Sequence, residues 1–141
     1  MSAASIFVDS SAFYALADRQ DASHRVATRR WEALVKAKQP LVSSLAVAAE
    51  TATLIRRWIG FDAAQAWLDQ LDRARLVRAV ELVFLAEREY ALARDLYRRL
   101  AQPKLSFTDA LNFSVMTLRG IKKCFGFDED FLIAGFSLYE S

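Results

Sequence analysis

Three acidic residues are each the only charged residue in a long apolar or small-residue stretch. They are Asp9 in the stretch 1–17, Glu50 in 41–55 and Asp109 in 105–118. An ionised carboxylate that leaves water without a partner is costly, so such groups become neutral, form ion pairs or bind a metal. No Lys or Arg lies inside these stretches to pair with them. Three isolated carboxylates therefore indicate a cation that they share.

Two of these acids also have a structural interpretation. Asp109 lies three residues after Ser106, which is the spacing of a capping box, and Asp9 could cap the helix that follows it. Glu50 has no comparable role, because every residue three or four positions away is uncharged and cannot form the usual helical ion pair. Glu50 is therefore expected to face something polar from another part of the chain.

The residue types available restrict the chemistry. Carboxylate ligands favour Mg²⁺ or Mn²⁺, whereas zinc and copper sites recruit imidazole or thiolate. The chain has one histidine, His24, and one cysteine, Cys124. We interpret His24 as a solvent-exposed surface residue and Cys124 as a small buried hydrophobe. The same shortage argues against Cys-His and Ser-His nucleophilic catalysis, and it leaves metal-assisted phosphoryl transfer with a carboxylate cage that activates water.

Hydroxyl groups and further acids lie next to the isolated carboxylates. Ser10, Ser11 and Thr108 could orient the carboxylates or a water, and they could equally cap helices. An acidic cluster at residues 128–130 lies between two phenylalanines, and by itself it is also typical of a solvated turn. A Gly-rich phosphate loop is absent from the sequence, which disfavours nucleotide binding in the P-loop manner.

Hydrophobic periodicity and helix breakers predict alternating strands and helices. The expected strands are 5–8, 41–42, 76–80, 123–127 and 136–139. The expected helices are 12–17, one capped by Asp21 and ending near 38, one capped by Ser43 or Ser44 and ending at 60, one opened by Asp62, then 85–100 and 106–120. Strands separated by long helices pair in parallel, so the expected fold is α/β.

In an open parallel sheet, the functional crevice lies outside the carboxyl ends of the strands. Asp9 and Asp128 follow two of the expected strands directly. Glu50 and Asp109 lie near the starts of helices that could face the same crevice. The isolated acids are therefore expected to converge.

Composition indicates one globular domain over residues 1–141, with 54% hydrophobic residues and one core. The net charge is +2, from 19 basic and 17 acidic residues, so any binding of a polyanion must be local. A lone cysteine forms no intramolecular disulfide and suits a reducing cytosol. The sequence resembles neither a signal peptide nor a membrane span, and we expect a cytoplasmic protein that does not contact the membrane.

Four segments resemble, in order and approximate spacing, the motifs of a PIN domain. They are Ile6 to Ser11, Ala49-Glu50, Ser106 to Ala110 and Phe125 to Phe131. The resemblance covers essentially the whole chain and is strongest to the VapC-type toxins of prokaryotic toxin–antitoxin modules. It implies a three-layer α/β/α fold with a short parallel sheet of four to five strands flanked by helices.

The resemblance also implies an activity, a Mg²⁺- or Mn²⁺-dependent endoribonuclease that leaves a 5′-phosphate. The catalytic and metal-binding residues that it implies are Asp9, Glu50, Asp109 and Asp128. Asp130 is the alternate to Asp128, and Ser10 and Thr108 would support the ligands. The implied partners are the RNA substrate, a small antitoxin whose tail enters the acidic groove, and a second copy of the chain in a homodimer.

Three other functions stay open. The first is a PIN-like nuclease that processes RNA or cuts DNA without a toxin role, and the second is a non-catalytic module that binds RNA or metal. The third is a metal-dependent phosphatase or a receiver-like phosphoacceptor, against which we note that Asp9 is followed by two serines instead of a second acid.

Basic and aromatic residues could contribute to nucleic-acid binding. Arg119, Lys122 and Lys123, and the arginine pairs at 56–57 and 98–99, could contact phosphates, although a solvated basic turn is the simpler interpretation. The three tryptophans could stack on bases, but their helical spacing favours burial in the core or in a protein interface. They are Trp31, Trp58 and Trp67.

Overall fold

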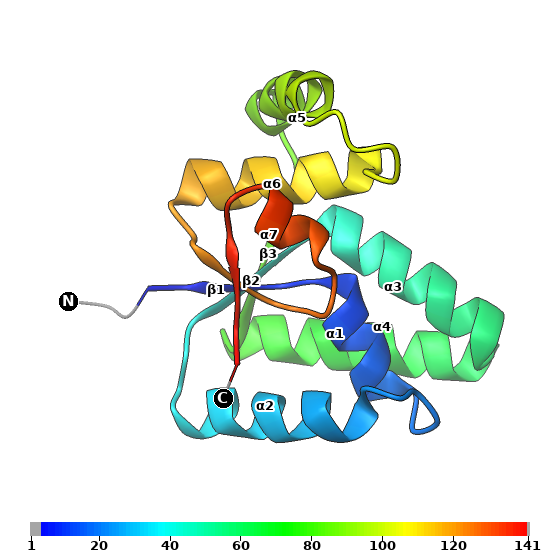
Figure 1. The fold of residues 1–141 in the computed structure, drawn as a ribbon. Coiled ribbons are helices and arrows are strands. Elements are labelled where there is room, and N and C mark those ends of the chain that lie inside the picture. The colour runs from blue at the N-terminus through cyan, green and yellow to red at the C-terminus, as the bar shows by residue number, and fades with distance from the viewer. Residues whose placement is uncertain (1–3, 141) are drawn as a thin grey trace.

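A five-stranded parallel sheet runs through the middle of the protein, with helices on both of its faces (Figure 1). The computed structural model describes residues 4–140. The strand order is β3-β2-β1-β4-β5. The strands are β1 (Ile6–Val8), β2 (Leu41–Ser44), β3 (Val80–Val83), β4 (Lys123–Phe125) and β5 (Ser137–Leu138). The predicted α/β class and the parallel pairing are confirmed.

Seven helices occur within the described residues, and Figure 1 shows α5 and α6 on the side of the sheet opposite α1, α2 and α4. The first four are α1 (Ser10–Ala17), α2 (His24–Lys36), α3 (Leu45–Trp58) and α4 (Phe61–Leu76). The others are α5 (Glu87–Arg99), α6 (Phe107–Arg119) and the short α7 (Asp130–Ile133). No helix in the range 4–140 has the length and apolar character that crossing a membrane requires.

The two central strands are buried, as is typical of a parallel sheet that is covered by helices on both faces. Phe7 of β1 and Phe113 of α6 both pack against Phe131, which is fully buried. Cys124 of β4 is buried as predicted, and its burial raises the pKa of the thiol well above its ordinary value. The core thus fixes the positions of the strand ends.

The strand predicted at 76–80 is wrong. Helix α4 continues to Leu76, and β3 begins at Val80, where it pairs with Leu41 of β2. The apolar run fits a strand by composition, but Leu76 and Val77 are exposed, and Arg78 adopts a positive φ of 60° that turns the chain. Most of the run is the exposed end of a helix followed by a turn, and only its last residue, Val80, belongs to the strand that pairs with β2 over residues 80–83.

Two predicted helix caps are also wrong. Helix α2 begins at His24, and the carboxylate of Asp21 accepts a hydrogen bond from the backbone N–H of Ser23 at 2.8 Å without capping the helix. Asp62 lies inside the first turn of α4, and the cap residue is Gly60 with φ 144°. An acid in the first turn is favourable near the positive end of the helix dipole whether or not it caps the helix. Composition therefore identified the helix starts only approximately.

Several surface predictions change in the fold. His24 is half-buried, and its Nδ1 lies 2.7 Å from the carbonyl oxygen of Ala15, so it is not freely exposed. Arg119 forms an ion pair with Glu81 at 2.8 Å. Trp67 is buried, whereas Trp58 is 69% exposed at the end of α3. Core burial is therefore confirmed for one tryptophan and excluded, within the described chain, for another.

Candidate active site

The carboxyl ends of β1 and β4 open into a cavity of about 300 Å³ that is lined by four acids predicted from the sequence. These are Asp9, Glu50, Asp109 and Asp128. Asp9 directly follows β1, and Asp128 lies three residues after the end of β4, which is shorter than the strand expected at 123–127. Helices α3 and α6 supply Glu50 and Asp109. The predicted convergence therefore occurs, at the sheet edge where ligands bind in open α/β folds.

Asp9 is the most deeply buried of these acids, at 4% exposure. It is the N-cap of α1, and its Oδ2 accepts hydrogen bonds from the hydroxyl of Ser11 at 2.9 Å and from the Ser11 backbone N–H at 3.4 Å. Burial, with a smaller contribution from the charge of Glu50, raises the pKa of Asp9 to about 6 although hydrogen bonds from Ser10 and Ser11 oppose the increase. Asp9 therefore both caps a helix and places a partly protonated carboxyl in the cavity.

Glu50 contradicts the burial argument, because its side chain is exposed. Neighbouring residues on α3, Val47, Ala48 and Thr51, are buried, whereas Glu50 lies outside that buried stripe. The polar partner that we expected is present: Ser10 donates a hydrogen bond to Glu50 Oε2 at 2.9 Å. Glu50 is therefore isolated in the sequence but faces solvent and the cavity in the fold.

Asp109 combines the two roles considered for it. Its side chain accepts from the backbone N–H of Ser106 at 3.1 Å, and its own N–H donates to the Ser106 hydroxyl at 3.0 Å, so the capping box is confirmed. The same carboxylate lines the cavity. Burial raises the pKa of Asp109, and the nearby charge of Asp128 adds to this.

A compact acidic group lies where α6 and α7 meet. One carboxylate oxygen from each of Asp109, Asp128 and Asp130 lies within 4.8 Å of the others. Asp128 Oδ1 also accepts from the backbone N–H of Asp130 at 2.9 Å, just before the helix α7 that sequence reasoning missed. Asp128 lines the cavity that contains Asp9, whereas Asp130 does not. An all-carboxylate set without His or Cys fits a hard divalent cation.

Ser11, Gly126 and Phe127 join the first and last acidic segments. The Ser11 hydroxyl accepts from the backbone N–H of Phe127 at 2.9 Å while it donates to Asp9. A Cβ on Gly126 would lie 3.0 Å from both Asp9 Cβ and Ser11 Oγ, so the backbone approaches this closely only because the residue is glycine. The glycine between two phenylalanines is the sequence signal that could have identified this contact. Thr108 makes no side-chain hydrogen bond within residues 4–140 and does not line the cavity.

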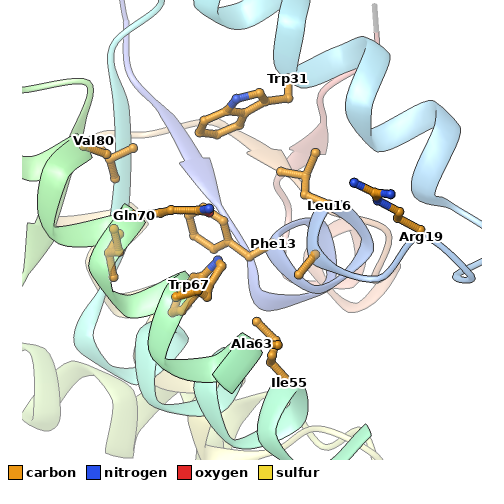
Figure 2. Close-up of a pocket in the computed structure, with 13 residues that line it drawn as sticks. Phe13, Leu16, Arg19, Trp31, Ile55, Ala63, Trp67, Gln70 and Val80 are labelled. Atoms are coloured by element: carbon orange, nitrogen blue, oxygen red, sulfur yellow. The ribbon is translucent and has the colours of Figure 1, made fainter. Parts of the chain in front are cut away.

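A second hollow of about 430 Å³ lies between α1, α2 and α4 and is of a different kind (Figure 2). Phe13 projects into it between Trp31 and Trp67, with the Phe13 and Trp67 rings edge to face at 5.3 Å. Arg19 is the only charged residue that lines it among the described residues, and no carboxylate does. This hollow is larger than the acidic cavity but offers no group for acid–base or metal chemistry.

Comparison with known proteins identifies the family. A model of the PIN domain matches residues 6–136. The chain belongs to the PIN domain family. It is also similar to the 23S rRNA-specific endonuclease VapC20 from two strains of Mycobacterium tuberculosis, with 36% identity over 132 residues that cover 93% of this chain and 95% of the relative.

Solved PIN structures share the fold. The crystal structure of Mycobacterium tuberculosis VapC20, a Sarcin-Ricin loop cleaving toxin, superposes with a TM-score of 0.80 at 35% identity and covers 93% of this chain and 95% of its own. VapBC2 from Rickettsia felis, bound to a DNA fragment from its promoter, superposes with a TM-score of 0.70 at 15% identity, over 96% of this chain and 98% of its own. FitAcB from Neisseria gonorrhoeae superposes with a TM-score of 0.71 at 11% identity, over 96% of each chain. The last two likenesses concern the fold alone.

Proposed function

We propose that this chain is a metal-dependent endoribonuclease that hydrolyses RNA phosphodiester bonds, and that it is the toxin of a type II toxin–antitoxin pair. The observation that carries the proposal is the meeting of four acids from distant segments in one cavity. The similarity to an rRNA-specific endonuclease along 93% of the chain supports RNA as the substrate and ribosomal RNA as its class.

Mg²⁺ or Mn²⁺ would be held by Asp9, Glu50, Asp109 and Asp128, with Asp130 next to the last two. When bound, such an ion activates water and stabilises the charge that develops in phosphoryl transfer. The donor set fits this role, because carboxylate oxygens alone are the ligands that hard divalent ions prefer.

The hydroxyl groups around the acids set the orientation of two carboxylates. Ser11 holds Asp9 Oδ2 and Ser10 holds Glu50 Oε2, each at 2.9 Å. One oxygen of each carboxylate is thereby fixed by the protein, which leaves the other oxygen available to a ligand. The pKa of about 6 at Asp9 means that this carboxyl releases its proton near neutral pH, where a cation would replace it.

We also propose that residues 1–141 form a single PIN domain, that the protein works in the cytoplasm, and that it binds a small antitoxin and a second copy of itself. Large apolar side chains around the turn between α3 and α4 support a protein partner, since Trp58, Ile59 and Phe61 are all exposed. Exposed apolar residues that cluster in this way are typical of interaction surfaces.

The test is incubation of the purified chain with labelled ribosomal RNA, with and without Mg²⁺ or Mn²⁺, beside Asp9→Asn and Asp109→Asn variants. We expect cleavage that requires the ion and is lost in both variants. Asp69→Asn is the matched control, because Asp69 is exposed on α4 and away from the cavity. Cleavage that persists in EDTA or in both variants would exclude the mechanism, and a preference for single-stranded DNA would favour a nuclease without the toxin role.

A further inference from the structure

Asn112 is a buried amide on α6, the helix that carries Asp109. It is fully buried on α6, three residues after Asp109, so the two side chains lie on the same side of the helix. Its Oδ1 accepts a hydrogen bond from the hydroxyl of Ser44 at 2.9 Å, although the two residues are 68 positions apart. Ser44 ends β2 and caps α3, the helix that carries Glu50. One hydrogen bond therefore joins the helices of two site acids.

The amide of Asn112 is only half used. Its Nδ2 donates no hydrogen bond to any protein group within the described residues, although the atom is buried. A buried donor without a partner is destabilising, and an apolar side chain of similar size would avoid that cost. The contribution that an apolar residue could not make is the acceptor for Ser44.

The bonds that Asp109 makes for itself are local. Both join it to Ser106 in its own helical turn, so they orient the carboxylate but do not set its distance from Asp9. That distance depends on how α6 sits on the sheet. Ser43, the neighbour of Ser44, donates to the carbonyl oxygen of Val8, the residue before Asp9, at 2.8 Å. A continuous series of short contacts therefore runs from Asp9 through β2 to Asn112 and Asp109.

We propose that Asn112 is a positioning residue, which holds α6 on the end of β2 so that Asp109 keeps the separation from Asp9 and Glu50 that a shared divalent cation requires. This rests on the proposed function, because it assigns the purpose of the separation to metal binding. The unpaired Nδ2 donor of Asn112 then lowers stability, and it is retained because Oδ1 of the same amide is needed as the acceptor for Ser44.

The experiment compares the wild-type chain with Asn112→Leu, using Mn²⁺ alone as the probe. Calorimetry gives the Mn²⁺ dissociation constant without RNA, and denaturation in EDTA gives the stability of the metal-free chain. We expect Mn²⁺ to bind about tenfold more weakly in Asn112→Leu, as is typical when a group that orients metal ligands is lost. We expect the unfolding midpoint to change little, because the variant removes the unpaired Nδ2 donor but leaves the buried Ser44 hydroxyl without its acceptor.

Ser114→Ala is the matched control. Ser114 is equally buried on α6, but its hydroxyl bonds to the backbone of its own helix, at Leu111. We expect its Mn²⁺ affinity to stay within about twofold of the wild type. Ser44→Ala should weaken Mn²⁺ binding as Asn112→Leu does, and the double variant should be no weaker than Ser44→Ala alone, because both changes remove the same bond.

Unchanged Mn²⁺ affinity in a folded Asn112→Leu chain, or additive effects in the double variant, would overturn the proposal. If Asn112→Leu does not fold, Asn112→Ala takes its place in the same comparison. RNA cleavage is measured separately. If the wild-type chain binds Mn²⁺ but does not cut RNA, the proposed function is refuted, and the Mn²⁺ affinities still decide the role of Asn112. If the wild-type chain binds no Mn²⁺, this inference is refuted as well.

Discussion

Glu50, and the Ser11 that binds Asp9, form hydrogen bonds with distant parts of the chain, whereas Asp109 and Asp128 form theirs within their own turns. Ser10 and Glu50 are 40 positions apart, and the Ser11 that holds Asp9 is itself held by Phe127, 116 positions away. Asp109 bonds to a residue three positions away, and Asp128 to one two positions away. We refer to these as the long-range half and the local half of the acidic cavity.

The difference shows how one site can combine two kinds of order. The conformation of the local half follows from helix capping and a tight turn, which a short sequence can specify. The long-range half exists only once the tertiary structure has placed β1 beside β4 and α1 beside α3. We therefore expect the long-range half to be the part that loosening of the tertiary structure disrupts first.

The largest expected effect concerns Asp128, which belongs to the local half, and its neighbour Asp130. Asp128→Asn should lower the rate of metal-dependent RNA cleavage by at least about a hundredfold, because it removes a carboxylate that faces the cavity. Asp130→Asn should cost clearly less, because Asp130 does not line the cavity. Single-turnover cleavage at saturating Mg²⁺ measures both. The reverse order would identify Asp130 as the metal ligand.

The next effect tests the long-range half through pH. Because the pKa of Asp9 is 3.8 when unperturbed and about 6 in the folded chain, the folded state binds this proton more tightly. The stability contributed by the protonated form is therefore lost as the pH rises from about 4 to above 6, by on the order of 3 kcal/mol.

Chemical denaturation in EDTA at pH 5 and pH 8 measures the part of that loss above pH 5, roughly half of it. Asp9→Asn should be more stable than the wild type at pH 8, and its advantage should shrink at pH 5, where the wild-type carboxyl is largely protonated. An advantage that does not depend on pH would contradict the raised pKa. Saturating Mg²⁺ should reduce the advantage at pH 8, because the cation would stabilise the ionised carboxylate only in the wild type.

The contact between the two halves can be broken at Gly126. Gly126→Ala should lower the free energy of unfolding by about 1 to 3 kcal/mol, because the new Cβ would lie 3.0 Å from Asp9 Cβ and Ser11 Oγ. Gly120→Ala is a useful contrast. Gly120 has open space around it but a φ of 67°, so any cost there arises from backbone strain. Weaker Mn²⁺ binding is expected only in Gly126→Ala.

The smallest effects compare one hydroxyl from each half. Ser11→Ala removes the donor to Asp9 and the acceptor of the Phe127 N–H, and should cost about 1 to 3 kcal/mol of stability. Ser106→Ala removes an exposed helix cap and should cost about 1 kcal/mol. Thermal denaturation measures both, and a larger loss for Ser106→Ala would reverse the comparison between the halves.

The features that the sequence predicted well are those with local causes. The caps at Ser44 and Ser106 and the end of α6 at Gly120 are where residue type and spacing indicated. The prediction of a strand at 76–80 was wrong because an apolar run is compatible with the end of a helix as well as with a strand. Only the pairing with β2 distinguishes the two structures. The short helix α7 was missed because four residues are too few to show a period.

The sequence by itself indicated the candidate site residues, because isolated carboxylates and the scarcity of imidazole and thiol are properties of composition and order. It also determined the α/β class, through alternating apolar segments. Only the tertiary structure decided that Asp9 is buried and Glu50 exposed, and that Ser11, Gly126 and Asn112 support them. Burial and long-range hydrogen bonds depend on which segments the sheet and helices bring together, and that information is not present in any short stretch of the chain.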